Sequence, residues 1–385
     1  MTAFAFSTVA TILSEPGITT RLGEVIVERF PGTQRVLVVT DAGFMRTGLL
    51  DPAQRSLAQQ GMRVAVFSGV VADPPEAVVI DAVDAARRLD ADLVLGFGGG
   101  SSMDVAKLVA VLAPSQQLLA DTYGIGKVSG QRLPLVQVPT TAGTGSEVTN
   151  IAIVTTGATT KMGVVAPQLH ADLAILDASL TLGLPPNVTA ATGIDAMVHA
   201  IEAYTSKHKK NPLSDALARE ALSLLSNNLI RACKQGSDLQ ARQAMLLGAC
   251  LAGQAFSNAP VAAVHALAYP IGGIFHVPHG LSNALVLPHV LRFNLTESSK
   301  LYAELAGIIA PGTAGSETAR AEALIVAMQQ IGKIAGIETT LRQVGIQESD
   351  LDRLADDAML QTRLLGNNPR EVTRADARAI YAAAL

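Results

Sequence analysis

The fold of this chain is decided by the stretch Asp92-Leu-Val-Leu-Gly96-Phe97-Gly98-Gly99-Gly100-Ser101-Ser102-Met103-Asp104. Here a short apolar run, typical of a buried strand, passes through three glycines into a helical pattern. Glycines at such a turn let the backbone approach a ligand closely, and the free N–H groups at a helix start can bind phosphate. We therefore expect α/β structure with a pyrophosphate site at residues 98–101. Because the Gly-x-Gly-x-x-Gly fingerprint is absent, a simple tight turn is the alternative.

The flanking sequence extends this pattern over the first half of the chain. Short apolar runs alternate with amphipathic stretches, which predicts a mostly parallel sheet with helices on its faces. Strands are expected at residues 35–40, 63–67, 92–96, 135–138 and 173–176, and a hairpin at 151–155 and 162–165. Helices are expected at residues 44–60, 75–89 and 101–112.

The second half of the chain is predicted to be helical. After about Asp177 the strand signals fade, and Ala/Leu-rich helical patterns continue nearly to the C-terminus. Ser214 is a candidate N-cap for a helix that ends near Gly236, and Thr373 is a candidate cap for the last helix. The shift in composition predicts two domains, an α/β domain over residues 1–178 and an all-helical domain over residues 179–385, packed closely with a cleft between them.

The composition is that of an enzyme without a nucleic-acid partner. The 385 residues carry a net charge of −4, which offers no basic field for nucleic acid. With 49% hydrophobic residues the chain is expected to form a subunit interface, as a homodimer or a larger homo-oligomer. No apolar run reaches membrane-spanning length and no secretion signal is recognisable. Cys233 and Cys250 lack the spacing of a metal or redox motif, so we expect free thiols and a cytoplasmic location.

The helical half also holds a set of side chains that could bind a metal. Asp195 and His199 stand four residues apart in a helix-favouring run, so both project from one helix face. His265 and His279 follow later, and three imidazoles with one carboxylate suit a borderline divalent ion such as iron(II) or zinc. The apolar surroundings support this interpretation, because unpartnered polar groups are costly there. An ordinary hydrogen-bonded Asp–His pair is the alternative for the first two residues.

Two further places in the α/β half could contact a nucleotide. Asp41 follows the strand at 35–40, where a carboxylate can accept a hydrogen bond from a ribose and repel a 2′-phosphate, which favours NAD over NADP. A turn-forming aspartate is the alternative. The loop Pro139-Thr140-Thr141-Ala-Gly-Thr-Gly-Ser-Glu147-Val-Thr149 is crowded with hydroxyls and glycines. It forms either a polar wall for a ligand or a self-capping turn, and its position one strand after the glycine loop favours the wall.

Four motifs together resemble the iron-containing (group III) alcohol dehydrogenase family. In chain order they are Gly98-Gly-Gly-Ser101, Pro139-Thr-Thr-Ala-Gly-Thr-Gly-Ser-Glu147, Gly193-Ile-Asp195-x-x-x-His199-x-x-Glu202 and His265-x13-His279-Gly280. The resemblance runs from about Gly23 to near the C-terminus. It implies a dehydroquinate-synthase-like architecture, with an NAD-binding α/β domain, a helical metal-binding and catalytic domain, and the metal in the cleft between them.

The resemblance also implies roles for individual residues. The metal ligands of the family match Asp195, His199, His265 and His279, with iron(II) as the preferred ion and zinc as the alternative. Phe256 matches a pocket residue near the nicotinamide, and Asp41 stands at the position that favours NAD. The family's cofactor contacts match Gly98, Gly99, Gly100, Ser101, Asp104, Thr140, Thr141 and Lys161, and we add Thr149 from the same hydroxyl-rich loop.

Three positions depart from the family pattern. Many members have a second histidine one helical turn after the first of the two late ligands, but this chain has Tyr269. A proton relay at that position is therefore in doubt, and His276 is a candidate substitute. Ala262 replaces a glycine, a change expected to alter packing only. Asp73 with the following proline replaces an Asn-Pro, so a contact with the adenosine or ribose could be lost or altered.

These features predict hydride transfer between a small alcohol, or the matching aldehyde or ketone, and NAD(H), with the metal binding the substrate oxygen. Phe256, Val261, Tyr269 and Ile274 are apolar pocket candidates that favour an uncharged substrate. A tyrosine at the position of Tyr269 also resembles the hydroxyacid–oxoacid transhydrogenases, and that activity is the closest alternative. Glycerol-dehydrogenase-like, maleylacetate-reductase-like and dehydroquinate-synthase-like activities are weaker alternatives, the last because the carboxylate ligand is Asp195 rather than a glutamate. A non-catalytic NAD-binding protein is disfavoured because no ligand is missing.

Overall fold

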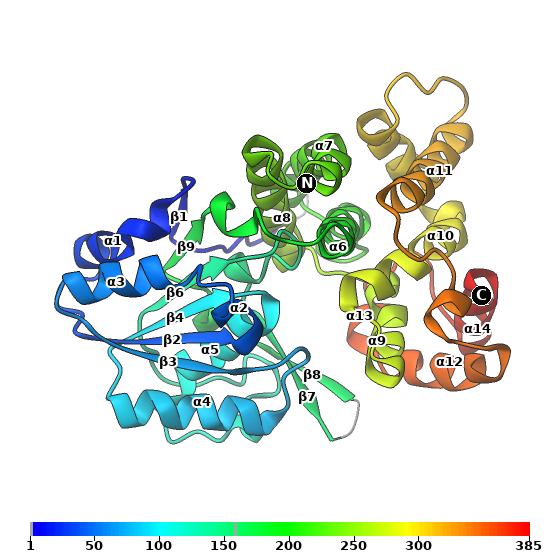
Figure 1. The fold of residues 1–385 in the computed structure, drawn as a ribbon. Coiled ribbons are helices and arrows are strands. Elements are labelled where there is room, and N and C mark those ends of the chain that lie inside the picture. The colour runs from blue at the N-terminus through cyan, green and yellow to red at the C-terminus, as the bar shows by residue number, and fades with distance from the viewer. Residues whose placement is uncertain (1–2, 158–159) are drawn as a thin grey trace. The chain divides into compact units, whose positions relative to one another are not determined.

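The protein is described here from a computed structural model, which defines residues 3–157 and 160–385. The chain divides into an α/β unit, formed by Thr8–Thr141 and Gly145–Leu182, and a helical unit, Gly183–Leu385 (Figure 1). Two short segments of the first half, residues 3–7 and Ala142–Thr144, pack with the helical unit. The boundary expected at 178/179 lies a few residues before Gly183, and the assignment of these two segments to the helical unit was not predicted.

The α/β unit is built on a six-stranded sheet in the order β1-β9-β6-β4-β2-β3, and every neighbouring pair is parallel. All six residues of β4, the strand before the glycine loop, are buried, as expected for a strand in the middle of a parallel sheet. The predicted parallel sheet is confirmed, except that β1 was not predicted. The strands are β1 Thr11–Ser14, β2 Arg35–Asp41, β3 Arg63–Val70, β4 Leu93–Gly98, β6 Leu135–Pro139 and β9 Leu173–Leu176.

Helices cover both faces of this sheet (Figure 1). α1 (Leu22–Arg29) and α3 (Asp51–Gln59) pack with alternate strand residues such as Val36 and Val38 in one apolar core. The other face carries α4 (Glu76–Leu89) and α5 (Gly100–Leu112).

The single helix expected at residues 44–60 is wrong. The chain forms a short helix, α2 (Ala42–Met45), and then α3, because the backbone turns at Gly48, whose φ is +72°. That left-handed conformation interrupts an α-helix and is one that glycine adopts without strain.

A smaller three-stranded sheet, in the order β5-β8-β7, belongs to the same unit. Its strands are β5 (Gly124–Ile125), β7 (Ile151–Thr156) and β8 (Thr160–Val165). β7 and β8 pair antiparallel, which confirms the predicted hairpin. The predicted turn of this hairpin includes residues 158–159, which lie outside the described residues.

The helical unit is organised around α6, most of whose residues are buried against α7, α8 and α10. Gly193 allows this approach, since a Cβ there would lie 2.5 Å from Leu229 Cδ1 and 2.7 Å from Met245 Cε. The all-helical second half is confirmed. Its helices are α6 Pro186–Thr205, α7 Pro212–Lys234, α8 Leu239–Asn258, α9 Ala263–Phe275, α10 His279–Ile309, α11 Glu317–Ala335, α12 Leu351–Met359, α13 Thr362–Leu365 and α14 Arg374–Ala384.

One of the two predicted helix caps is correct. Thr373 caps α14, with its side chain accepting the N–H of Asp376. Ser214 is not the cap of α7, because Asn211 takes that place and accepts the N–H of Ser214. The Asn-Pro pair at 211–212 is therefore a helix start, with proline at the first helical position, where its missing N–H costs nothing.

Within residues 3–157 and 160–385, no single helix is long and apolar enough to cross a membrane. α8 and α9 meet that requirement only when they are taken together, and the chain bends by 108° between them.

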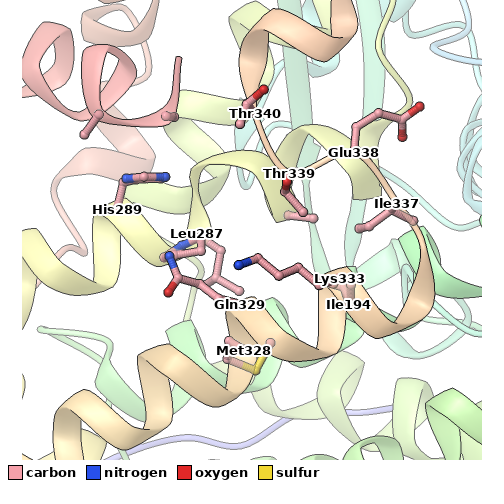
Figure 2. Close-up of a pocket in the computed structure, with 15 residues that line it drawn as sticks. Ile194, Leu287, His289, Met328, Gln329, Lys333, Ile337, Glu338, Thr339 and Thr340 are labelled. Carbon is pink, nitrogen blue, oxygen red and sulfur yellow. The ribbon is translucent and has the colours of Figure 1, made fainter.

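A cavity of about 290 Å³ lies in the helical unit between α10, α11 and α14 (Figure 2). Leu287 and Met328 give it an apolar wall, while Lys333 and His289 lie at its polar side. Ile194 of α6 also lines the cavity, but none of the four predicted metal ligands does. The cavity is therefore distinct from the site described next.

Candidate metal centre and cofactor site

Two of the four predicted ligands lie on α6. Asp195 and His199 are one turn apart and buried, with His199 Nε2 4.0 Å from Asp195 Oδ1. α6 begins at Pro186, and proline at the first position of a helix favours helix formation. The alanine, methionine, valine and isoleucine residues around the pair pack into the helical unit, so the helix that carries the two ligands is held on several sides.

The other two ligands come from α9 and α10. His265 lies in the first turn of α9, and His279 is the first residue of α10. Their Nε2 atoms lie 3.8 Å and 3.7 Å from Asp195 Oδ1. Gly280 allows α10 to approach α6, since a Cβ at that position would lie 2.4 Å from the carbonyl oxygen of Ala191.

The four groups fit a single divalent ion. One ligand atom from each of Asp195, His199, His265 and His279 lies within 4.8 Å of the other three. The Asp–His separations of 3.7 to 4.0 Å are within the reach of two metal–ligand bonds of roughly 2.0 to 2.2 Å each. Three imidazoles and one carboxylate form a donor set that both iron(II) and zinc accept. The structure thus brings together all four residues predicted from the sequence.

The protonation states of the two ligands on α6, His199 and Asp195, suit metal binding. Burial lowers the pKa of His199 to about 4, against the attraction of Asp195, so this imidazole is neutral at neutral pH. Burial alone would raise the pKa of Asp195, but the three histidines and a hydrogen bond from Asn283 outweigh it and lower that pKa. A neutral imidazole and an ionised carboxylate are the forms that bind a metal.

Two further buried residues contact the ligands. Asn283 lies one turn after His279 on α10, and its Nδ2 donates to Asp195 Oδ1 at 2.6 Å. The same Nδ2 lies 3.2 Å from His265 Nε2 and 3.3 Å from His279 Nε2. Glu202, on α6, lies with its Oε2 2.6 Å from His265 Nδ1. Glu202 therefore contacts the cluster from outside, at Nδ1 of His265, whereas Asn283 contacts the carboxylate oxygen and the Nε2 atoms that lie together within the cluster.

The predicted pocket residues Phe256 and Tyr269 lie beside the ligands. The Phe256 ring stacks on His199, with 4.4 Å between ring centroids and 22° between the planes. The Tyr269 ring lies 5.9 Å from that of His279 at an angle of 53°. His276, the other candidate for a proton relay, is an exposed residue at the end of α9 with φ +56°.

The predicted glycine loop joins β4 to α5 in the α/β unit. β4 ends at Gly98, Gly99 precedes the helix and Gly100 is its first residue. A Cβ at Gly98 would lie 2.7 Å from Ser102 Oγ, whereas at Gly99 the nearest atom would be Thr141 Oγ1 at 3.8 Å. Packing therefore requires glycine at position 98 but leaves room for a methyl group at position 99.

Two other predicted cofactor residues lie next to this loop. The Thr140 N–H donates to the Gly98 carbonyl at 2.9 Å, which joins the end of β6 to the loop. Asp41 Oδ1 accepts from the Phe44 N–H at 2.8 Å and so caps α2. Asp41 Oδ2 lies on the side of Gly98, 3.8 Å from the position of a Cβ there. The capping role is present, and the second carboxylate oxygen lies beside the glycine loop.

Asp104 and Thr149, both predicted as cofactor contacts, belong to a hydrogen-bond network around Lys107. Lys107 Nζ donates to Ser146 Oγ at 2.7 Å and to Thr149 Oγ1 at 3.0 Å. Asp104 accepts from Ser146 Oγ at 2.6 Å and from the Ile153 N–H at 3.0 Å. The network ties the loop after β6 to α5 and thereby shapes the hydroxyl-rich loop.

Burial is the largest cause of the pKa shifts of Lys107 and of the neighbouring Glu147. It lowers the pKa of the fully buried Lys107, although Asp104 opposes the shift. It raises the pKa of Glu147, in the same loop, to about 7, with Lys107 again opposing. A base on α5 and an acid in the loop after β6 are therefore both shifted toward their neutral forms.

The remaining predicted cofactor residue, Lys161 on β8, forms an ion pair with Asp73. Lys161 Nζ lies 2.6 Å from Asp73 Oδ1, and Asp73 has a left-handed backbone with φ +50°. Asp73 is the residue that replaces an asparagine of the family pattern. The replacement thus gives the predicted cofactor lysine an anionic neighbour.

Comparison with known proteins identifies the family of this chain. The family described as "Iron-containing alcohol dehydrogenase" matches residues 10–178, and "Fe-containing alcohol dehydrogenase family, C-terminal" matches residues 189–385. The chain belongs to the iron-containing alcohol dehydrogenase family. It is an oxidoreductase of the NAD-dependent alcohol dehydrogenase class and uses a divalent metal.

Individual relatives agree over nearly the whole chain. Long-chain-alcohol dehydrogenase 1 of Geobacillus thermodenitrificans (strain NG80-2) is 45% identical over 359 residues, 92% of this chain and 90% of the relative. NAD-dependent methanol dehydrogenase of Bacillus methanolicus is 35% identical over 356 residues, 92% of this chain and 93% of the relative. A crystal structure of 1,3-propanediol oxidoreductase has a TM-score of 0.95 at 35% identity, with both chains covered completely. The predicted family, fold and reaction class are confirmed.

Three residues that shape the site received no role from the sequence, although Glu202 ends one of the motifs quoted for the family resemblance. Glu202 and Asn283 follow metal ligands by one helical turn, at His199 and His279, so helical spacing was the available signal. Lys107 was signalled by its position as a lone cation in an otherwise apolar helical run. A charged residue in such a run needs a buried partner, and the loop after β6 supplies it.

Proposed function

We propose that one divalent ion, iron(II) or alternatively zinc, is held by Asp195, His199, His265 and His279. The observation that supports this most directly is the convergence of four ligand atoms within 4.8 Å. Such an ion supplies Lewis acidity, which lowers the pKa of an alcohol oxygen and polarises a carbonyl. The donor set of three imidazoles and one carboxylate suits both ions.

Around the ion, this chain's own residues control access and orientation. Phe256 covers one face of the His199 ring, and Tyr269 packs against His279. Both aromatic rings exclude water from the surroundings of the ligands and offer an apolar surface to a substrate. Together with Val261 and Ile274 they favour a small uncharged alcohol, or the corresponding aldehyde, over a charged substrate. The named relatives act on long-chain alcohols and on methanol, so the family name does not fix the chain length.

We further propose that NAD binds at the glycine loop of the α/β unit. The N–H groups at the start of α5 are suited to a pyrophosphate, and Asp41 Oδ2 lies beside that loop, where it favours NAD over NADP. Asp104 and Thr149 support the neighbouring loop through Lys107. The proposed contacts are Gly98, Gly99, Gly100, Ser101, Asp104, Thr140, Thr141, Thr149 and Lys161.

The proposed setting is a cytoplasmic homodimer or larger homo-oligomer. Several large apolar side chains lie at the surface of the single chain, among them Leu118, Ile125 and Leu360, which are 67 to 70% exposed. A subunit interface would remove such side chains from water. Cys233 and Cys250 are buried and neither forms a disulfide, which is compatible with a reducing compartment.

The proposal is tested by metal analysis of the purified protein together with a substrate panel. The protein is stripped with a chelator, reloaded with iron(II) or zinc, and supplied with NAD and primary alcohols, diols or hydroxy acids. We expect NADH to accumulate with an uncharged primary alcohol and only in the metal-loaded protein. Full turnover after removal of all metal would contradict the proposed centre.

Tyr269 gives one specific reason to keep a second activity in the same experiment. A hydroxyacid–oxoacid transhydrogenase would pass hydride from a hydroxy acid to an oxo acid without net formation of NADH. The panel therefore includes a hydroxy acid with and without an oxo acid. Product formed only when both acids are present, with no NADH from alcohols, would favour the transhydrogenase.

A further inference from the structure

Glu202 contacts the metal site without being a metal ligand. It lies on α6, three residues after His199, and only 4% of its surface is exposed. Its Oε2 lies 2.6 Å from His265 Nδ1, and its Oε1 accepts the Val264 N–H at 2.7 Å. Both oxygens of one buried carboxylate are therefore engaged by consecutive residues at the start of α9.

The contact with Val264 replaces a missing helix cap. Ala262, the residue before α9, offers no side-chain acceptor to the first turn of that helix. N–H groups in a first turn lack intrahelical partners and favour a nearby negative charge. Glu202 supplies both the acceptor and the charge from a neighbouring helix. It thereby fixes the backbone that carries His265.

The contact with His265 determines which ring nitrogen carries the proton. A carboxylate only accepts hydrogen bonds, so Nδ1 is the donor and Nε2 retains its lone pair. Nε2 is the atom that faces the ligand cluster, 3.8 Å from Asp195 Oδ1. The tautomer required for a metal ligand is therefore the one that Glu202 stabilises.

We propose that Glu202 is a positioning residue that holds His265 in the orientation and tautomer needed for metal binding. This inference rests on the proposed metal centre and adds a requirement to it. As a result, α6 controls three of the four ligands. It carries Asp195 and His199 directly, and it orients His265 through Glu202.

The substitution Glu202→Gln tests this role with little change of shape. Both groups that contact Glu202 are N–H donors, whereas an amide has a single acceptor oxygen. If that oxygen keeps the Val264 N–H, the amide NH2 faces His265 Nδ1 and favours the tautomer protonated on Nε2. We expect metal affinity to fall roughly 10- to 100-fold, the usual effect of losing an outer partner of a ligand.

Metal affinity is measured for zinc and for iron(II) by competition with a chelator, on protein whose folding is checked in the metal-free state. The matched control is Tyr204→Phe, which removes a 2.6 Å hydrogen bond to Glu304 between α6 and α10. It should leave metal affinity unchanged. Parental affinity in a folded Glu202→Gln protein would overturn the role of Glu202 alone. A parent protein that binds neither metal would overturn the proposed centre itself.

A second measurement needs no change at Glu202. Nitrogen-15 NMR of the metal-free parent reports which ring nitrogen of each histidine is protonated, and His265→Ala assigns the relevant signal. We expect the proton of His265 on Nδ1. A proton on Nε2 would overturn the proposal even if Glu202→Gln fails to fold.

Discussion

The ligand cluster of the helical unit and the glycine loop of the α/β unit are made from different parts of the polypeptide. The cluster consists of side chains from α6, α9 and α10, with Glu202 and Asn283 as hydrogen-bonding partners. The glycine loop consists of backbone between β4 and α5, where Gly98 has no room for a side chain. One site depends on which side chains are present, and the other on which are absent.

This difference predicts how each site can be damaged. A site made of side chains is lost when one of them is truncated, even if the backbone stays in place. A site made of backbone N–H groups is lost when an added side chain displaces the loop or its ligand. The metal and cofactor functions should therefore be separable by substitution, and the following experiments test that separation.

The largest effect is expected for His265→Ala. The variant loses a metal ligand and leaves the buried carboxylate of Glu202 without its imidazole partner. We expect metal affinity to fall by more than the roughly 100-fold that an outer partner can cost, and alcohol oxidation to be abolished. NAD binding, measured by calorimetry, should stay close to parental because the glycine loop belongs to the other unit.

The control for His265→Ala is His289→Ala. His289 is a half-buried histidine of α10 that lines the cavity shown in Figure 2 and is not among the ligand residues. It should retain metal and activity. Unchanged turnover in His265→Ala would remove His265 from the ligand set, and loss of NAD binding would show that the two sites cannot be separated.

The same difference explains how much of each site was predictable from the sequence. The four metal ligands could be proposed from the sequence because carboxylate and imidazole groups commonly bind metals. They are Asp195, His199, His265 and His279. The pairing of Glu202 with His265 could not, because it joins residues 63 positions apart and requires knowledge of how α6 and α9 pack. The residue types were enough to predict the metal ligands, but not to predict a contact between residues far apart in the sequence.

For the fold, local patterns were informative and long-range order was not. The buried run of β4 and the turn into α5 were predicted because their residues act over a few positions. β1 was missed, since it is a four-residue, partly buried strand at the sheet edge that pairs only with β9. The expected helix at residues 44–60 failed at Gly48, where one left-handed residue outweighed the helical pattern.

The next effect in size is expected at the glycine loop, where Gly98→Ala and Gly99→Ala form a matched pair. A Cβ at Gly98 would lie 2.7 Å from Ser102 Oγ, so the first variant should lose about 1 to 3 kcal/mol of stability from overpacking. At Gly99 the φ of −77° suits alanine and the nearest atom is 3.8 Å away. That variant should keep its stability to within about 0.5 kcal/mol.

NAD binding provides the second measurement on this pair. A methyl group at Gly99 blocks the close approach of a pyrophosphate to the backbone, so we expect NAD affinity to fall about tenfold, or ~1.4 kcal/mol. Urea denaturation and NAD titration are measured on both variants, with metal content as the internal control. If Gly99→Ala binds NAD as the parent does, the glycines form only a tight turn.

The smallest effect is expected for Asp41→Asn, which separates the two roles of that residue. Asparagine can still accept the Phe44 N–H and cap α2, so the fold of the loop should not change. The negative charge beside the glycine loop is lost, and with it the repulsion of a 2′-phosphate. We expect the preference for NAD over NADP, as the ratio of kcat/KM values, to fall by less than about tenfold.

The control for Asp41→Asn is Asp81→Asn, which makes the same change in net charge at an exposed position of α4. Only the variant beside the glycine loop should alter the cofactor preference, because screening weakens the effect of a distant surface charge. A shift of equal size in both variants would mean that overall charge, not position, attracts NADP. An unchanged ratio in Asp41→Asn would leave Asp41 with its capping role alone, and the choice of cofactor would then have to depend on the loop's backbone.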